Sequence, residues 1–204
     1  MKANRSVPDL PQVYVELRDR ILIHLAQIRK TQKKHPEYAV ALMIAVASEA
    51  LSRLRNRRRS TVFARELLAR PHRVNEAVGR ALFQAVRHGL AHRYDTALIT
   101  VGKQKVVVVI TWRRPSMHLR VRSGDWLHDG VQRPGVYLDM ETMCADLGAY
   151  LKRLTSALRR DSRLARQVEQ QGKRLDQRYM VSIKAESLAT WQRFLKDRHV
   201  WLQR

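Results

Sequence analysis

The chain has a single cysteine, Cys144, among its 204 residues. One cysteine excludes an intramolecular disulfide framework and a zinc site built on several cysteines, and it is typical of a reducing compartment. Long apolar runs are missing too. Residues 1–30 contain no apolar signal core, and the longest run, Tyr38 to Ala47, has ten residues, about half of what a membrane span needs. The sequence therefore predicts a cytoplasmic protein with no membrane-spanning segment.

Acidic residues are scarce beside basic ones. There are 18 Asp and Glu against 40 Lys and Arg, a formal net charge of +22, so the expected partner is a polyanion. An anionic membrane surface favours a lysine-rich amphipathic helix with a bulky apolar face, whereas arginine dominates the basic clusters here. Arginine is the better planar, bidentate phosphate ligand, so the composition favours nucleic acid without distinguishing RNA from DNA.

The spacing of apolar residues predicts helices in the first half of the chain and strands after them. Intervals of three and four residues indicate amphipathic or buried helices over 10–28, 36–47 and beyond, 60–69 and 74–91. Alternating or β-branched runs then indicate strands over 97–101, 106–112, 118–121 and 136–138, with a hairpin turn at 102–105 and a loop at 123–135. The simplest arrangement of these strands is a small antiparallel sheet.

A long helix is predicted after the strands, with Asp139 as its N-cap. Its apolar side is formed by Met143, Leu147, Leu151, Leu154 and Leu158. The predicted fold class is therefore α-rich α+β, a helical bundle with a small antiparallel sheet inserted at about 96–138 before a long closing helix. Residues 1–160 form this domain. A basic extension follows over 161–204, with a short strand at 179–183, a last helix at 186–197, and its docking on the bundle left open.

An arginine and a histidine stand five residues apart near the end of the fourth predicted helix. The guanidinium of Arg87 can neutralise phosphate oxygens, and the imidazole of His92, with an ordinary pKa of about 6.5, can exchange protons near neutral pH. Residues five apart on a regular helix differ by about 140° in direction, so both reach one phosphate only if the helix loosens, at Gly89. The structural alternative is that Arg87 caps the helix and His92 hydrogen-bonds a carbonyl.

Beyond its first turn, the apolar second helix contains a single acid, Glu49. An unpaired carboxylate there is costly, so Glu49 needs a cationic or hydrogen-bonding partner, and Arg87 is the predicted one. The pair then orients the guanidinium of Arg87, or it is a structural ion pair only.

Five arginines with no acid among them follow the second helix. Such a run is usually a solvated face, yet these side chains repel one another unless an anion is present. We therefore expect contacts to the RNA backbone that weaken steeply with salt. The five residues are Arg53, Arg55, Arg57, Arg58 and Arg59.

The arrangement of Arg87, four residues, His92, one residue and Tyr94 at the end of a bundle helix resembles the HEPN superfamily. In that family an arginine is followed after four to six residues by a histidine, commonly with a polar residue directly after the arginine, here His88. The resemblance covers roughly residues 10–160. It implies a metal-independent endoribonuclease, often a toxin or defence effector, acting as a homodimer whose two motifs face one another across a cleft. Arg87 and His92 are then catalytic, and Glu49, His88 and Tyr94 support them.

Tyr94 gives the motif a form similar to toxins encoded beside a minimal nucleotidyltransferase, in which an antitoxin modifies the tyrosine with adenylate. Those toxins are shorter and lack the β-rich insert. The resemblance thus implies an antitoxin or regulatory partner, and the alternative is that Tyr94 is simply a packed or hydrogen-bonded ring.

The expected reaction is attack of the ribose 2′-hydroxyl on the adjacent phosphorus. His92 handles the proton and Arg87 stabilises the phosphorane, giving a 2′,3′-cyclic phosphate and a 5′-hydroxyl and sparing DNA. No cofactor is expected. His88 and His92 lie four residues apart but have no third ligand nearby, so no metal site is predicted. The alternative function is a non-catalytic RNA- or DNA-binding protein whose histidine is structural.

Overall fold

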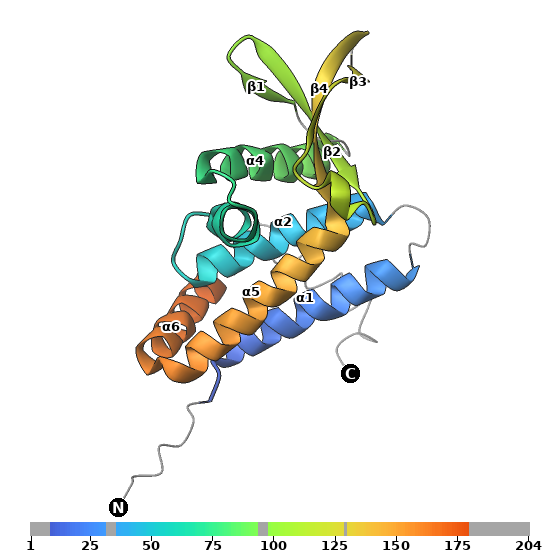
Figure 1. Ribbon diagram of the computed structural model, residues 1–204. Coiled ribbons are helices and arrows are strands. Elements are labelled where there is room, and N and C mark those ends of the chain that lie inside the picture. The colour runs from blue at the N-terminus through green and yellow to red at the C-terminus, as the bar shows by residue number, and fades with distance from the viewer. Residues whose placement is uncertain (1–8, 32–35, 94–97, 129, 180–204) are drawn as a thin grey trace, which may run out of the picture. The chain divides into compact units, whose positions relative to one another are not determined.

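The computed structural model describes residues 9–31, 36–93, 98–128 and 130–179 (Figure 1). The chain divides into two compact units, Met1–Gly172 and Lys173–Arg204, and the division falls inside the last helix, α6 (Ser162–Tyr179). Tyr179 ends α6, and the rest of the expected strand at 179–183 and the expected helix at 186–197 lie outside the described residues. All elements except the end of α6 belong to the first unit.

Helices form most of the described first unit. They are α1 (Gln12–Thr31), α2 (Glu37–Leu54), a π-helix η1 (Val62–Ala69), α3 (Arg70–His72), α4 (Glu76–Arg93) and α5 (Met140–Arg160). The predicted helices of the first half and the long helix after the strands are confirmed. Pro71 does not end the third helix, because it occupies an early position of α3, where its missing N–H is tolerated. No helix in the described part is long and apolar enough to cross a membrane.

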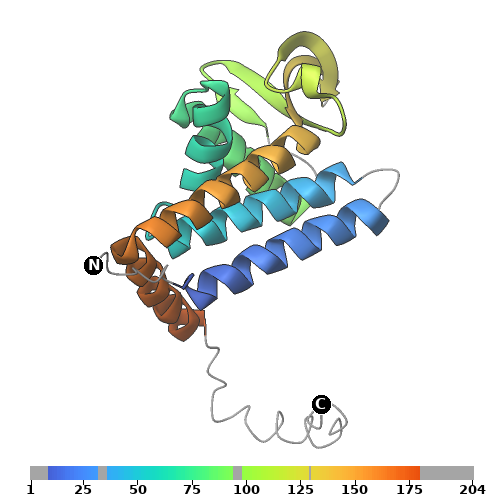
Figure 2. The same cartoon turned by 60° about the horizontal axis from the view of Figure 1, so that its bottom comes forward.

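α2 is the central helix, and α1 and α5 run beside it (Figure 2). Its buried side chains include Val40, Ile44 and Leu51, each fully shielded from solvent. The apolar run does not make α2 buried all round, because Tyr38 is 44% exposed and Val46 is 41% exposed. One face of α2 therefore remains open to solvent.

The apolar residues of the π-helix η1 fit its geometry. In a π-helix the backbone hydrogen bonds join residues five apart, so positions i and i+5 share a face. Phe63 and Leu68 stand in this relation and both are buried, as are Val62 and Leu67. η1 packs closely on α4: a Cβ added at Gly79 would lie 2.8 Å from Ala64 Cα.

The described sheet has four strands in the order β1-β2-β4-β3. They are β1 (Ile99–Val101), β2 (Gln104–Thr111), β3 (Val121–His128) and β4 (Val131–Asp139). β1 and β2 form the predicted hairpin, whose turn contains Gly102 at a φ of 59°. β4 returns between β3 and β2 and is antiparallel to β3 but parallel to β2, so the predicted antiparallel sheet is wrong and the sheet is mixed.

The strand expected at 118–121 and the loop expected at 123–135 are also wrong. His118 follows a short 3-10 helix, η2 (Pro115–Met117), and β3 begins only at Val121. β3 is an edge strand with exposed residues at its start, a left-handed Gly124 and a register shift between Arg122 and Trp126. These features remove the alternation of apolar and polar residues by which an ordinary strand is predicted.

α5 begins at the predicted N-cap. The buried carboxylate of Asp139 accepts hydrogen bonds from the Thr142 backbone N–H at 3.0 Å and from the Arg114 backbone N–H at 2.7 Å. The predicted apolar side is confirmed, since Met143, Leu147, Leu151, Leu154 and Leu158 are all buried. With the helices packed on this sheet, the protein has the α-rich α+β fold class that the sequence predicted.

The first half of α6 packs as part of the first unit. Ala165 and Val168 are buried, and Gly172 lies so close to Val13 that an added Cβ would be 2.6 Å from Val13 Cγ2. The compact unit therefore extends to Gly172, beyond the boundary expected at residue 160.

Candidate functional site

The arginine-rich segment after α2 is shaped by the way that helix ends. Asn56 adopts a left-handed φ of 51°, and its N–H donates to the Arg53 carbonyl at 2.8 Å. The Arg57 N–H donates to the Ser52 carbonyl, also at 2.8 Å. This pair of bonds is a Schellman motif, which asparagine tolerates better than most residues. The chain therefore turns out of the helix, and Arg57, Arg58 and Arg59 are exposed.

Glu49 lies where α2, the arginine segment and α4 meet, and its side chain is only 16% exposed. Arg53 Nη2 donates to Glu49 Oε1 at 2.7 Å, and Arg59 Nε lies 3.6 Å from the same oxygen. Arg87 Nε donates to the other oxygen, Oε2, at 3.3 Å. The predicted pairing of Glu49 with Arg87 is thus confirmed. Three guanidiniums against one carboxylate leave a local excess of positive charge.

Arg87 is held from one side of its guanidinium. Its bond to Glu49 uses Nε, so the two terminal nitrogens extend past the carboxylate, and the side chain is 32% exposed. A guanidinium fixed in this way presents a planar pair of donors, the geometry that matches two phosphate oxygens. We call the four residues Glu49, Arg53, Arg59 and Arg87 the Glu49 cluster.

The remaining motif residues are placed less completely. α4 continues without a break from Glu76 to Arg93, so the loosening expected at Gly89 is absent. His88 is exposed on α4. His92 belongs to α4, but its side chain lies outside the described residues, as does the whole of Tyr94. Positions 87 and 92 of one chain therefore leave the helix about 140° apart.

Arg55 differs from its neighbours in the arginine segment. Its Nη1 lies 3.4 Å from the hydroxyl of Tyr150 in α5, and its Nε is buried. Burial raises the pKa of Tyr150, and the bond from Arg55 opposes this. Arg55 therefore joins α2 to α5 and does not extend the exposed surface formed by Arg57, Arg58 and Arg59.

Sequence reasoning missed a second group of polar side chains. His72, His118 and Asp146 come from α3, the segment after η2, and α5, and they meet in the folded chain. Each residue is isolated in the sequence, with no ligand-like spacing to the others. Only the fold brings them together.

No protein-family model, curated protein or solved structure matches this chain. The resemblance to the HEPN superfamily thus depends on the motif residues themselves.

Proposed function

We propose that the protein is a metal-independent endoribonuclease of the HEPN type, with Arg87 and His92 as its catalytic residues. The observation that carries the proposal is the bond from Arg87 to Glu49, which fixes one edge of the guanidinium and directs the other away from the carboxylate. A fixed guanidinium is suited to stabilising the extra negative charge of a phosphorane. His92 of the same helix supplies the group that exchanges the proton.

The substrate is single-stranded RNA. The exposed side chains of Arg57, Arg58 and Arg59 adjoin the Glu49 cluster through Arg59, so backbone phosphates entering along the segment lead to Arg87. An unpaired strand lets the 2′-hydroxyl reach the in-line position for attack on the adjacent phosphorus. The products are a 2′,3′-cyclic phosphate and a 5′-hydroxyl.

The active form is a homodimer. Because α4 is unbroken, positions 87 and 92 of one chain leave the helix about 140° apart, and a cleft between two copies can combine residues that one helix separates. Tyr38, Leu42 and Val46 line one face of α2 at helical spacing, and the same face continues to Glu49. An apolar face beside the cluster supports association there, since burying it removes apolar surface from water.

The second candidate function is a non-catalytic nucleic-acid-binding protein. The observation favouring it is the exposure of Arg57, Arg58 and Arg59 beside the basic Glu49 cluster, which is sufficient for binding phosphates without any chemistry.

The test is cleavage of a labelled single-stranded RNA in excess EDTA, at protein concentrations that give equal RNA occupancy. We expect Arg87→Ala and His92→Ala each to lower the cleavage rate about hundredfold or more. The matched controls Arg20→Ala and His24→Ala, on exposed positions of α1, keep the wild-type rate. Tight binding without cleavage by the wild type would instead establish the binding protein.

A further inference from the structure

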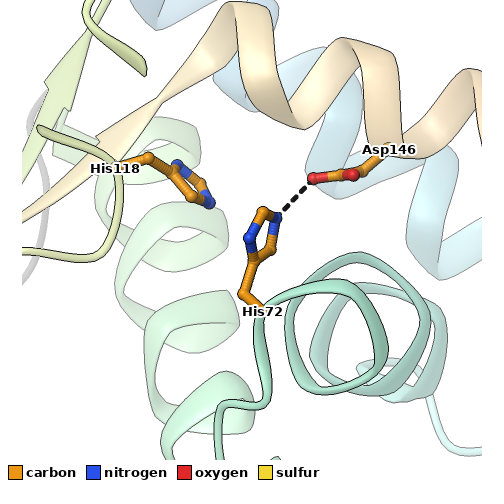
Figure 3. Close-up of side chains that lie close together, drawn as sticks. All are labelled: His72, His118 and Asp146. Carbon is orange, nitrogen blue, oxygen red and sulfur yellow. Dashed lines mark hydrogen bonds and ion pairs between the residues drawn. The ribbon is translucent and has the colours of Figure 1, made fainter. Parts of the chain in front are cut away.

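Two histidines and one aspartate converge beside the sheet (Figure 3). His72 Nε2 lies 2.7 Å from Asp146 Oδ2, and the rings of His72 and His118 have centroids 4.6 Å apart. One possible ligand atom from each residue lies within 4.8 Å of the other two. Three segments that are distant in the sequence therefore present nitrogen and oxygen donors to one point.

This donor set has the chemistry of a zinc site. Two imidazoles and one carboxylate, with a water in the fourth position, are a usual tetrahedral environment for Zn²⁺, whereas Mg²⁺ and Ca²⁺ prefer oxygen ligands alone. Bonds of about 2.0–2.2 Å place tetrahedral ligand atoms roughly 3.3 Å apart. Small side-chain movements are sufficient to widen the 2.7 Å separation between His72 and Asp146 and to shorten the longer separations, all of which are within 4.8 Å, to that value.

The hydrogen bonding of His118 shows which change of protonation Zn²⁺ binding requires in this ring. The Asp139 backbone N–H donates to His118 Nδ1 at 3.1 Å, so the neutral ring carries its proton on Nε2. Nε2 is buried and has no hydrogen-bond partner among the described residues. Burial and the neighbouring His72 lower the pKa of His118 to about 4, so the ring is neutral at pH 7. Metal binding at Nε2 then moves this proton to Nδ1 and ends the bond from Asp139.

The free energy of Zn²⁺ binding exceeds the cost of the hydrogen bonding that His118 loses. Leaving both the Asp139 N–H and the new Nδ1–H without an acceptor weakens binding by roughly hundredfold or more. Structural zinc sites in peptides have association constants of roughly 10⁷ M⁻¹ or higher at pH 7, so a site with three protein ligands tolerates that loss. At His72 the ion replaces the hydrogen bond between Nε2 and Asp146, and the neutral, metal-bound ring carries its proton on Nδ1. The buried Nε2 of His118 gains the partner it lacks.

We propose that His72, His118 and Asp146 bind one Zn²⁺ ion, which joins the end of α3 to α5 and to the segment leading into β3. The site shares no residue with the Glu49 cluster and does not depend on the proposed ribonuclease activity. Its role is to hold the sheet against the helices.

The test is calorimetric titration of the untagged, EDTA-treated and dialysed full chain with Zn²⁺. The wild type is expected to bind one ion with a dissociation constant of roughly micromolar or tighter. Asp146→Asn keeps the size of the side chain and an acceptor for His72, yet binding weakens about hundredfold. His72→Ala loses it similarly, and the exposed control His24→Ala binds like the wild type.

A nitrogen NMR spectrum of the histidine side chains supplies a readout that weak surface binding does not change. Zn²⁺ is expected to shift His118 from the form protonated at Nε2 to the form protonated at Nδ1. Circular dichroism of each variant verifies that it is folded. Zinc affinity that is equal in the wild type and Asp146→Asn, or an unchanged His118 spectrum at saturating zinc, would overturn the proposal and leave a neutral histidine packed beside an Asp–His pair.

Discussion

The Glu49 cluster and the group of His72, His118 and Asp146 differ in the kind of charge they hold. The first consists of guanidiniums and a carboxylate, all charged at neutral pH, with an excess of positive charge beside an exposed loop. The second contains a neutral, largely buried His118 packed against His72. Permanent charge suits a polyanion at any pH, whereas neutral nitrogen donors suit a metal ion. The strongly positive net charge of the chain therefore indicates the ligand of the Glu49 cluster, a polyanion, but gives no sign of the group of His72, His118 and Asp146.

The sharpest change to the first cluster is Glu49→Gln. It removes the negative charge that holds three guanidiniums but adds no bulk, so Arg87 loses its orientation while the surface becomes more basic. We expect RNA cleavage at saturating protein to fall about tenfold to hundredfold, with RNA affinity unchanged or higher. The exposed control Glu16→Gln keeps both values. Parallel loss of affinity and cleavage in Glu49→Gln would show that Glu49 supports the fold and does not position Arg87.

Acid is expected to destabilise the second cluster through His118. The pKa of His118 is about 4 in the folded chain and about 6.5 when unfolded, because burial and the neighbouring His72 lower it by more than Asp146 and Asp139 raise it. The unfolded chain thus takes up the proton first, so this stability is complete above pH 6.5 and is lost as the pH falls toward 4. After allowance for partial exposure of the ring, the loss is about 2 kcal/mol.

Urea unfolding of the metal-free protein between pH 7 and 4 measures this effect. His118→Gln is expected to be less stable at pH 7 but to lose less stability on acidification than the wild type. Identical pH dependence in both proteins would exclude His118 as the group responsible.

Gly79 tests the packing between the helices that carry the two clusters, because it belongs to α4, which carries Arg87, and contacts Ala64 of the π-helix that leads to His72. In Gly79→Ala the new Cβ meets the backbone of Ala64 at 2.8 Å, and we expect a net loss of about 1–2 kcal/mol in the free energy of unfolding. The control Gly148→Ala, in α5 with no atom within 4 Å, gains about 0.5–1 kcal/mol from helix propensity. A stabilised Gly79→Ala protein would contradict this close packing.

The smallest effect is expected in the exposed loop. The double variant Arg57→Ala/Arg58→Ala should bind single-stranded RNA several-fold more weakly, with the slope of log affinity against log salt shallower by about 0.7 per lost contact. Removing the same charge at Arg20 and Arg65, which are exposed elsewhere, should change the slope less. Equal changes in the two double variants would mean that net charge alone attracts the RNA.

The sequence predicted those parts of the fold and site that depend on local pattern. The helices were predicted because their apolar residues recur at helical spacing. Asp139 was predicted as the N-cap of α5 because it directly precedes such a pattern and its side chain can accept from the first backbone N–H groups. The pairing of Glu49 with Arg87 was predictable because Glu49 is the one acid in α2 beyond its first turn, and a carboxylate among apolar residues needs a cation. In each case the prediction needed only a few residues that are close in the sequence, or one charged side chain whose burial without a partner would be unfavourable.

The parts that were missed depend on contacts between distant segments. The parallel pairing of β2 and β4 follows from β4 inserting between β2 and β3, and the polar, irregular β3 gives no alternating pattern. His72, His118 and Asp146 stand in three separate elements, and no spacing links them. Burial also could not be read from composition alone, since Tyr38 and Val46 are exposed despite their positions in the longest apolar run of the chain.

The most direct test of the proposed function compares one single-stranded RNA with the DNA of the same sequence, each incubated with the wild-type protein in excess EDTA. The account predicts that both bind, that only the RNA is cut, and that its fragments carry 2′,3′-cyclic phosphate and 5′-hydroxyl ends. Binding of both strands without any cleavage, or equal cleavage of RNA and DNA, would contradict attack by the 2′-hydroxyl at a site formed by Arg87 and His92.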